Sequence, residues 1–210
     1  MVRTSGSWSP GIAHGSASAK WARACTTGAV TTPGTGHERL LELKDGTRVH
    51  VRPIRPEDEA RLHEAFARMS ERSVYFRFFS PLKRLPENVA RRLAQVDHDQ
   101  RFALVATTHR PDGAEHILGV ARYDRAPGTT TAEVAVAVVD DVQRQGVGSG
   151  LLSLLAQVAR EHGIEELTLI VLPENQSMLG LLRRLGWIHR AVLRGGVYEI
   201  TFATPASAPA

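Results

Sequence analysis

The segment from Glu133 to Gly150 constrains this chain more than any other part of the sequence. Residues Glu133–Val139 have the β-branched and small apolar composition of a buried strand, and a short polar loop follows them. Glycines then alternate with other residues at positions 146, 148 and 150, where we expect a long helix, 145–162, to begin. Because glycine has no Cβ, the backbone can approach a ligand closely there. Unpaired N–H groups at a helix start favour an anion, so the segment predicts a pyrophosphate site.

Two familiar phosphate-binding loops do not fit this segment. No Gly-Lys-Ser/Thr follows the glycines, which excludes a P-loop. A dinucleotide fold places its glycines after the first strand of the domain, with an acidic residue about 20 positions later. Here the glycines come late in the chain, and Glu165 and Glu166 precede a strand. A helix start whose small residues serve only packing remains an alternative.

The pattern around this segment predicts one mixed α/β domain over residues 37–204. We expect about seven strands flanked by about four helices, in the order ββααβββαβαββ. Val74–Phe79 is apolar and aromatic, and its simplest role is core packing. Residues 1–36 and 205–210 are rich in small residues without periodicity, so we expect two disordered tails. The predicted elements besides those above are strands at 39–43, 47–54, 102–107, 117–123, 167–172, 188–193 and 197–203, and helices at 56–70, 86–96 and 175–185.

Composition excludes several classes of function. Residues 1–36 carry three basic side chains and no acid, which leaves a net charge of only +1 for the rest of the chain and argues against nucleic-acid binding. Cys25 is the single cysteine, which excludes a disulfide framework and fits a cytoplasmic location. His98, His116 and His189 are scattered and are expected at the surface, so we predict no metal site. No apolar run approaches the ~20 residues of a membrane helix, so no membrane partner is expected.

The glycine loop also carries a resemblance. Gln143-x-x-Gly146-x-Gly148 resembles the coenzyme A pyrophosphate motif of the GNAT N-acetyltransferase superfamily. The likeness extends over about residues 38–203. Segments 51–58, 73–79 and 97–105 are similar, more narrowly, to the catalytic domain of bacterial Pat-type protein lysine acetyltransferases.

This resemblance implies acetyl-CoA as the acyl donor. The strands 133–139 and 167–172 would separate, and the pantetheine arm would lie between them. The backbone of Val138 and Val139 would pair with the pantetheine amides, and Asn175 would face the arm or the thioester. The full set of donor-binding residues that the resemblance implies is Val138, Val139, Gln143, Arg144, Gln145, Gly146, Val147, Gly148, Ser149, Gly150 and Asn175.

Acetyl transfer to an amine needs a base, because a lysine amine has a pKa near ~10.4 and is protonated at neutral pH. By resemblance Glu133 is that base. Strand alternation places it on a face with Ala135 and Ala137, which leaves room for a substrate. Burial on the strand would raise its pKa, whereas an exposed glutamate at a strand edge is the alternative.

Many GNAT enzymes carry a tyrosine as the acid to the leaving thiolate, but Leu182 occupies the corresponding position here. Tyr123 and Tyr198 are candidate substitutes. We therefore expect an N-acetyltransferase whose acceptor is a protein lysine. A small-molecule amine as acceptor, or a non-catalytic acyl-CoA-binding module, remains open, and so does a homodimer.

Overall fold

The computed structural model describes residues 36–111 and 113–204. The predicted tails and Cys25 therefore lie outside the described residues, except for Gly36. The described residues form an eight-stranded mixed sheet, five α-helices and two short 3-10 helices. The predicted mixed α/β class and element order are confirmed, with one strand and one helix beyond the approximate numbers expected.

Apart from a helix at residues 71–78, which was not predicted, the elements follow the predicted positions to within a few residues. The strands are β1 (Arg39–Glu42), β2 (Arg48–Pro53), β3 (Arg101–His109), β4 (Glu115–Arg125), β5 (Thr131–Val138), β6 (Glu166–Val171), β7 (Arg190–Arg194) and β8 (Val197–Ala203). The helices are η1 (Pro56–Asp58), α2 (Glu59–Ala67), α3 (Glu71–Phe78), α4 (Glu87–Ala94), η2 (Asp140–Val142), α5 (Val147–Glu161) and α6 (Gln176–Leu185).

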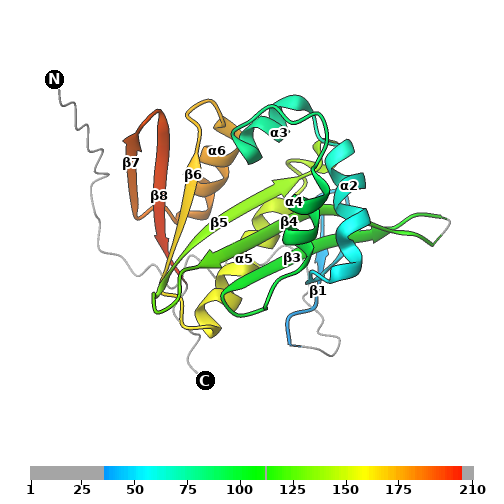
Figure 1. Ribbon diagram of the computed structural model, residues 1–210, viewed down its shortest axis with the longest axis horizontal. Coiled ribbons are helices and arrows are strands. Elements are labelled where there is room, and N and C mark those ends of the chain that lie inside the picture. Colours follow the sequence, from blue (N-terminus) through cyan, green and yellow to red (C-terminus); the bar gives the residue numbers. More distant parts are fainter. Residues whose placement is uncertain (1–35, 112, 205–210) are drawn as a thin grey trace.

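The sheet has the strand order β1-β2-β3-β4-β5-β6-β8-β7. Strands β5 and β6 run parallel, and the other neighbouring strands of the described sheet run antiparallel. A parallel pair needs a crossover connection, which α5 supplies. Figure 1 shows α5 behind the sheet, and α2, α3 and α4 in front of it. The β6-β8-β7 part of the front face is left uncovered in this view.

Helix α5 is amphipathic, and its apolar side faces the sheet. Leu151, Leu155 and Ala159 are fully buried, and the helix packs against β3, β4 and β5. The helix ends at Gly163, whose φ of 74° is the left-handed conformation that closes many helices. This packing fixes the start of α5 beside the end of β5, where the glycine loop lies.

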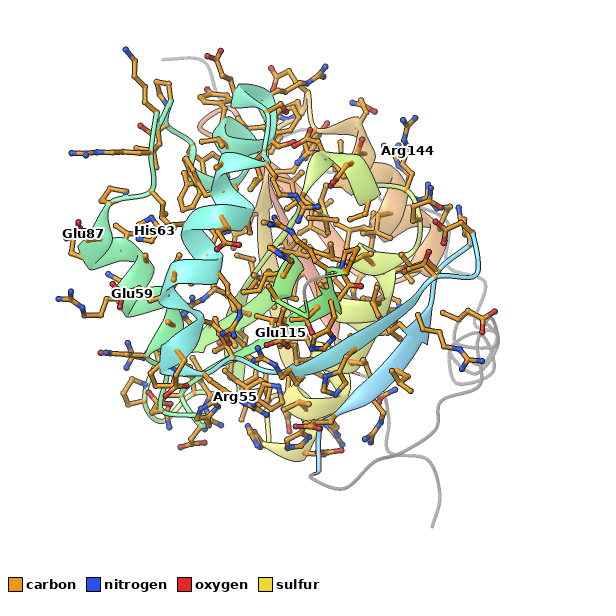
Figure 2. The ribbon with its side chains drawn as sticks, turned by 90° about the vertical axis from the view of Figure 1, so that its right-hand side faces the viewer. Arg55, Glu59, His63, Glu87, Glu115 and Arg144 are labelled. Carbon is orange, nitrogen blue, oxygen red and sulfur yellow. The ribbon has the colours of Figure 1, made fainter. Side chains whose placement is uncertain are left out.

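A buried ion network joins α2 to the sheet. Arg52 on β2 is 2% exposed, and its five N–H donors form five hydrogen bonds: two to Asp58, two to Glu115 and one to the Pro53 carbonyl. Asp58 also accepts hydrogen bonds from the Arg55 N–H and from Arg61. Glu115 and Arg55 are labelled in Figure 2, on the side of the molecule where β2 leads into α2.

Of two packing predictions, one holds only in part and one is wrong. Residues 74–78 form the second half of α3, where Val74 is buried in the core and Phe78 packs against it, but the rest of segment 74–79 does not fill the core. Tyr75 and Phe79 are 42% and 43% exposed. A helix on the surface of a sheet buries one side only, so apolar residues on its other side stay exposed. His116 is not at the surface: it is 4% exposed, with its Nδ1 3.0 Å from Glu64.

No helix among the described residues combines the length and the apolar character that a membrane crossing requires.

Candidate functional site

The two parallel strands separate early and leave a fork in the sheet. Thr131, Ala132 and Glu133 of β5 pair with β6, and the register ends at Glu133–Thr168. Strand β5 continues to Val138 without a partner on that side, although β4 pairs with it throughout. A cleft of about 690 Å³ occupies the fork, a size typical of small-molecule sites. It is lined by α3, both strands, the glycine loop and the start of α6.

Strand β5 presents free backbone groups to this cleft. The Val139 N–H donates to the Leu118 carbonyl, which lies on the β4 side. Because backbone groups alternate along a strand, the N–H groups of Val136 and Val138 point the other way, into the fork. The Val138 carbonyl accepts a hydrogen bond from the Gln143 side chain at 3.1 Å, in agreement with that direction. An extended ligand with amide groups could therefore pair with this edge as an added strand.

The glycine loop forms the closed end of the cleft. Gly146 has φ 112°, a backbone conformation that side chains disfavour, and it precedes the first turn of α5. The first internal hydrogen bond of α5 runs from the Gly150 N–H to the Gly146 carbonyl. The N–H groups of residues 147–149 come before that bond and have no helical acceptor. They stand at the positive end of the helix dipole, so this end of the cleft fits a pyrophosphate.

The structure brings most of the predicted site residues together. The cleft lining contains eight of them: Glu133, Val138, Gln143, Arg144, Gly146, Gly148, Ser149 and Asn175. Four others do not line it: Val139, Gln145, Val147 and Gly150. Val139 and Val147 are buried, and Gln145 meets Lys44 through its backbone carbonyl. A Cβ on Gly150 would collide with Leu41, so this glycine lets α5 lie close to β1.

Several lining residues already have structural partners. The Gln143 side chain donates to the Ser73 hydroxyl as well as to Val138, so it ties α3 to β5. Asn175 caps α6 by accepting the Met178 N–H at 3.1 Å. Arg144 is exposed and has φ 64°, and Figure 2 shows its side chain reaching out of the loop. The Gln143 side chain therefore ties the loop to both α3 and β5.

Glu133 lies where the fork opens, because it is the last residue of β5 that pairs with β6. Its side chain is exposed, so the expectation of a buried carboxylate is wrong at this position. Beyond it, Ala135 and Ala137 are only half-buried and also line the cleft. The small side chains leave space next to the carboxylate.

Neither tyrosine suggested as an acid lines the cleft. Tyr123 is fully buried, and its hydroxyl is bonded to the Asp99 carbonyl and to His162 Nδ1. Burial raises the pKa of Tyr123, which makes it a weaker acid still. Tyr198 lies on β8 outside the lining, and Leu182 is a core residue with no exposed surface. Among the described residues no cluster of three metal-ligating side chains is present.

The sequence analysis missed the contribution of α3. Ser70 caps this helix by accepting the Ser73 N–H, and the Asp140 carboxylate accepts hydrogen bonds from both serine hydroxyls. Arg77, from the same helix, lines the cleft as well. A signal was present, since Ser70 followed by Glu71 is a typical helix start. The sequence does not show that this helix forms a wall of the cleft, because its position depends on the tertiary structure.

Comparison with known proteins identifies the family and the fold. The profile of the Acetyltransferase (GNAT) family matches residues 65–187, more than half of the chain. The chain belongs to the GNAT family. It is an acetyltransferase of that family. The motif resemblance to the superfamily is thereby confirmed.

Two curated GNAT relatives extend over most of the domain. Acetyltransferase PA5475 from Pseudomonas aeruginosa is 32% identical over 153 residues, which cover 73% of this chain and 82% of that protein. Acetyltransferase Pat from Mycolicibacterium smegmatis is 30% identical over 152 residues. That match covers 70% of this chain but 44% of Pat, so this GNAT chain corresponds to less than half of that protein.

Solved structures agree with the sequence relatives. The GNAT domain of S. lividans PAT superposes with a TM-score of 0.75 at 33% identity, over 82% of this chain and 99% of that one. The putative acetyltransferase yncA from Salmonella typhimurium, solved with acetyl-CoA, has a TM-score of 0.58 at 17% identity, over 78% of this chain and 98% of that one. At that identity the second match shows the shared fold alone.

Proposed function

We propose that this GNAT enzyme takes acetyl-CoA as its donor and transfers the acetyl group to the amine of a protein lysine, with Glu133 as the base. The observation that carries the proposal is the position of Glu133 at the opening of the fork, inside the cleft. The likeness to Pat and to the S. lividans PAT domain supports a protein lysine as acceptor.

The chain has a suitable place for each part of the donor. The N–H groups at the start of α5 would hold the pyrophosphate, with Gly146 and Gly148 allowing close approach. The open edge of β5 would pair with the pantetheine amides through Val136 and Val138. This arrangement brings the thioester towards the fork, next to Ala135 and Glu133.

The reaction is then a single displacement. The protonated amine first loses a proton to Glu133, directly or through water. The free amine nitrogen then forms a bond to the thioester carbonyl carbon, the carbon–sulfur bond breaks, and the second N–H proton passes to solvent. The sulfur leaves as thiolate, because a thiol pKa near ~8.5 makes it a fair leaving group without a protein acid. This step needs no tyrosine in the cleft.

The test is the pH profile of the Glu133→Gln variant. At pH 7 we expect kcat/KM to fall by about 10²-fold or more, the usual contribution of a general base. As the pH rises towards the amine pKa of ~10.4, the variant should recover roughly tenfold per unit, because solvent deprotonates the amine instead. The rate is measured as thiol release with a lysine-containing protein as acceptor.

Glu166→Gln is the matched control, because Glu166 is exposed at the start of β6 and does not line the cleft. It should leave the profile unchanged. A Glu133→Gln variant that keeps near-wild-type kcat/KM at every pH would falsify the role of the base. A mass gain of about 42 Da on lysine, seen by mass spectrometry, tests the acceptor.

A further inference from the structure

A second, smaller cavity lies next to the cleft, on the side of β5 covered by α2 and α3. It has a volume of about 60 Å³, room for roughly four water molecules. Met69, Arg77, Ala135 and Ala137 line both the cavity and the cleft, so the two spaces adjoin along β5. The cavity therefore opens close to the proposed reacting centre.

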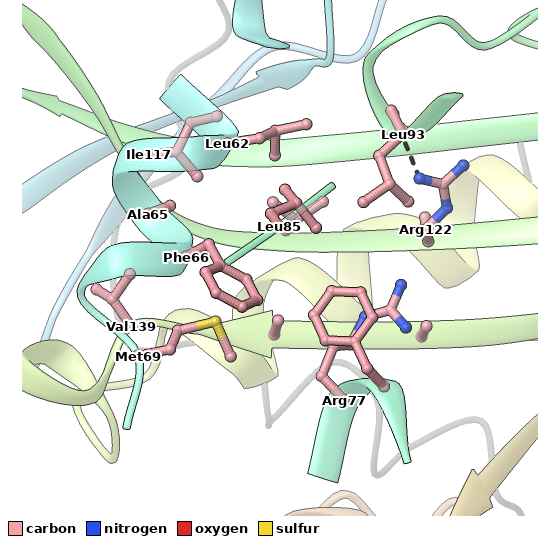
Figure 3. Close-up of a pocket in the computed structure, with 15 residues that line it drawn as sticks. Leu62, Ala65, Phe66, Met69, Arg77, Leu85, Leu93, Ile117, Arg122 and Val139 are labelled. Carbon is pink, nitrogen blue, oxygen red and sulfur yellow. Dashed lines mark hydrogen bonds between the residues drawn. The ribbon is translucent and has the colours of Figure 1, made fainter. Parts of the chain in front are cut away.

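The walls of this cavity are apolar, apart from two cations. Apolar residues from α2, α3, α4 and the sheet form most of the lining, with Arg77 and Arg122 as the charged members. Figure 3 shows the two guanidinium groups at the same end of the cavity, away from Ile117 and Leu62. No carboxylate side chain lines the cavity among the described residues.

Arg122 has structural partners for part of its guanidinium group. It is 5% exposed, its Nη1 donates to the Leu93 carbonyl at 3.3 Å, and its Nε lies 3.4 Å from Asp124. The dashed line in Figure 3 marks the bond to Leu93. Burial lowers the pKa of Arg122, although Asp124 opposes that effect.

Arg77 has no such partners. Within residues 36–111 and 113–204, its half-buried guanidinium has neither a hydrogen-bond acceptor nor a carboxylate within ion-pair distance. It lies over the Phe78 ring, 5.0 Å from the ring centroid. Burial and the charge of Arg122 lower the pKa of Arg77 to about 10, so it remains charged at neutral pH. Asp124 and Glu133 favour its charge from further away. Such a cation, which carries unused donors next to a cavity, is poised for an anion.

We infer that Arg77, together with Arg122, forms a subsite for a carboxylate that one of the two substrates brings to the reacting centre. A carboxymethyl arm is about the size of the cavity, and the planar guanidinium fork matches the carboxylate geometry. The carboxylate can belong to a dicarboxylic acyl chain on coenzyme A, or to an acidic side chain next to the acceptor lysine. The inference rests on the proposed function, because both sources need a substrate in the fork.

The experiment compares a charged and a neutral version of each substrate, the acyl donor and the acceptor peptide. Calorimetry gives the dissociation constants of succinyl-CoA and acetyl-CoA, and turnover with acetyl-CoA gives kcat/KM for two peptides whose lysine is flanked by Glu or by Gln. Wild type, Arg77→Gln and Arg77→Lys are measured. Arg84→Gln is the control, because this exposed arginine between α3 and α4 lines neither space. Melting temperatures verify that each variant is folded.

In Arg77→Gln, we expect the preference for the charged partner to fall by about tenfold or more in one of the two comparisons, while the neutral partner changes less than about twofold. If Arg77→Gln loses the preference for succinyl-CoA over acetyl-CoA, the carboxylate belongs to the donor. If it loses the preference for the Glu-flanked peptide over the Gln-flanked peptide, the carboxylate belongs to the acceptor. Arg77→Lys should recover part of the preference, because it restores the charge without the fork.

Two results overturn the inference. Either both preferences stay unchanged in Arg77→Gln, or charged and neutral partners weaken equally, which would make Arg77 a positioning residue for Glu133. If neither peptide is a substrate, the donor pair alone decides. Failure of wild-type protein to bind either thioester is a separate outcome: it removes the proposed function, and the carboxylate subsite with it.

Discussion

Two arginines on the same side of the sheet, the buried Arg52 and the half-buried Arg77, differ in the partners that the fold gives them. Arg52 forms five hydrogen bonds and meets two carboxylates, Asp58 and Glu115, at 2.7 and 2.8 Å. Arg77 forms none to the described residues, and its nearest charged neighbour in the cavity is another arginine. Both side chains are at least partly withdrawn from water. They differ in the hydrogen-bond acceptors and carboxylates that the protein supplies in place of water.

The pKa values follow this difference. Burial works against the charge of Arg52, but the hydrogen bonds to Asp58 and Glu115 raise its pKa overall. At Arg77 burial acts together with Arg122 and lowers the pKa. A cation that the fold has fully paired is part of the structure, whereas one left unpaired next to a cleft is available to a ligand. We therefore expect substitutions of the arginines and their partners to differ widely in their effect on stability.

The largest effect is expected for Arg52→Ala. It leaves the carboxylate of Asp58, which is fully buried, without its main partner, and breaking such a buried pair costs about 3–5 kcal/mol. Urea unfolding measures the loss. Arg55→Ala is the control, because the Arg55 side chain is 56% exposed and its pair with Glu38 is worth about 1 kcal/mol at most. Equal losses in the two variants would contradict the structural role of Arg52.

Glu115→Gln should have the next largest effect, with a dependence on pH. The hydrogen bonds from Arg52 lower the pKa of Glu115 to about 2 from 4.5. The stability from this carboxylate is therefore present above pH ~4.5 and is lost as the pH falls towards 2. We expect Glu115→Gln to cost about 1–3 kcal/mol at neutral pH and to lose less stability on acidification than wild type.

Melting temperatures between pH 2 and 7 measure this pH dependence. Glu166→Gln is the control, because that side chain is exposed. A Glu115→Gln profile parallel to that of wild type would show that the buried network does not depend on the ionised Glu115.

Arg122→Met is expected to cost about 1 kcal/mol. The substitution removes one backbone hydrogen bond and one ion pair to an Asp124 that is 47% exposed, but it keeps an unbranched chain of similar length in an apolar cavity. Denaturant midpoints measure the change. A loss near that of Arg52→Ala would show that Arg122 is as fully paired as Arg52, which would weaken the comparison.

The smallest effect on stability is expected for Arg77→Gln, within about 0.5 kcal/mol of wild type. No hydrogen bond to the described residues is lost, and the repulsion with Arg122 is relieved. Thermal melting without ligand measures it. A destabilisation above about 2 kcal/mol would show that Arg77 has a structural partner, and would contradict the difference drawn between Arg77 and Arg52.

Much of the fold was predictable because its signals are local. Strand composition, turn glycines and the helix start at residues 146–150 predicted the element order. The position of the fork was predicted only through the family resemblance, whose motif lies in the same loop. The local pattern failed for segment 74–79, since an apolar aromatic run suits a buried strand and a partly covered helix equally. It also gave no reason to separate Gly150, which packs against Leu41, from Gly146, whose φ requires glycine.

The sequence by itself determined most of the chain's secondary structure, its GNAT motif and the loop where a helix start offers free N–H groups, because these properties depend on residues within a few positions of one another. Only the tertiary structure decided that Glu133 stands at the last pair before the fork, and that Arg77 of α3 meets Arg122 of β4. It also gave Arg52 its carboxylate from Glu115, far along the chain. Charges interact through space, and the sheet register sets which of them meet.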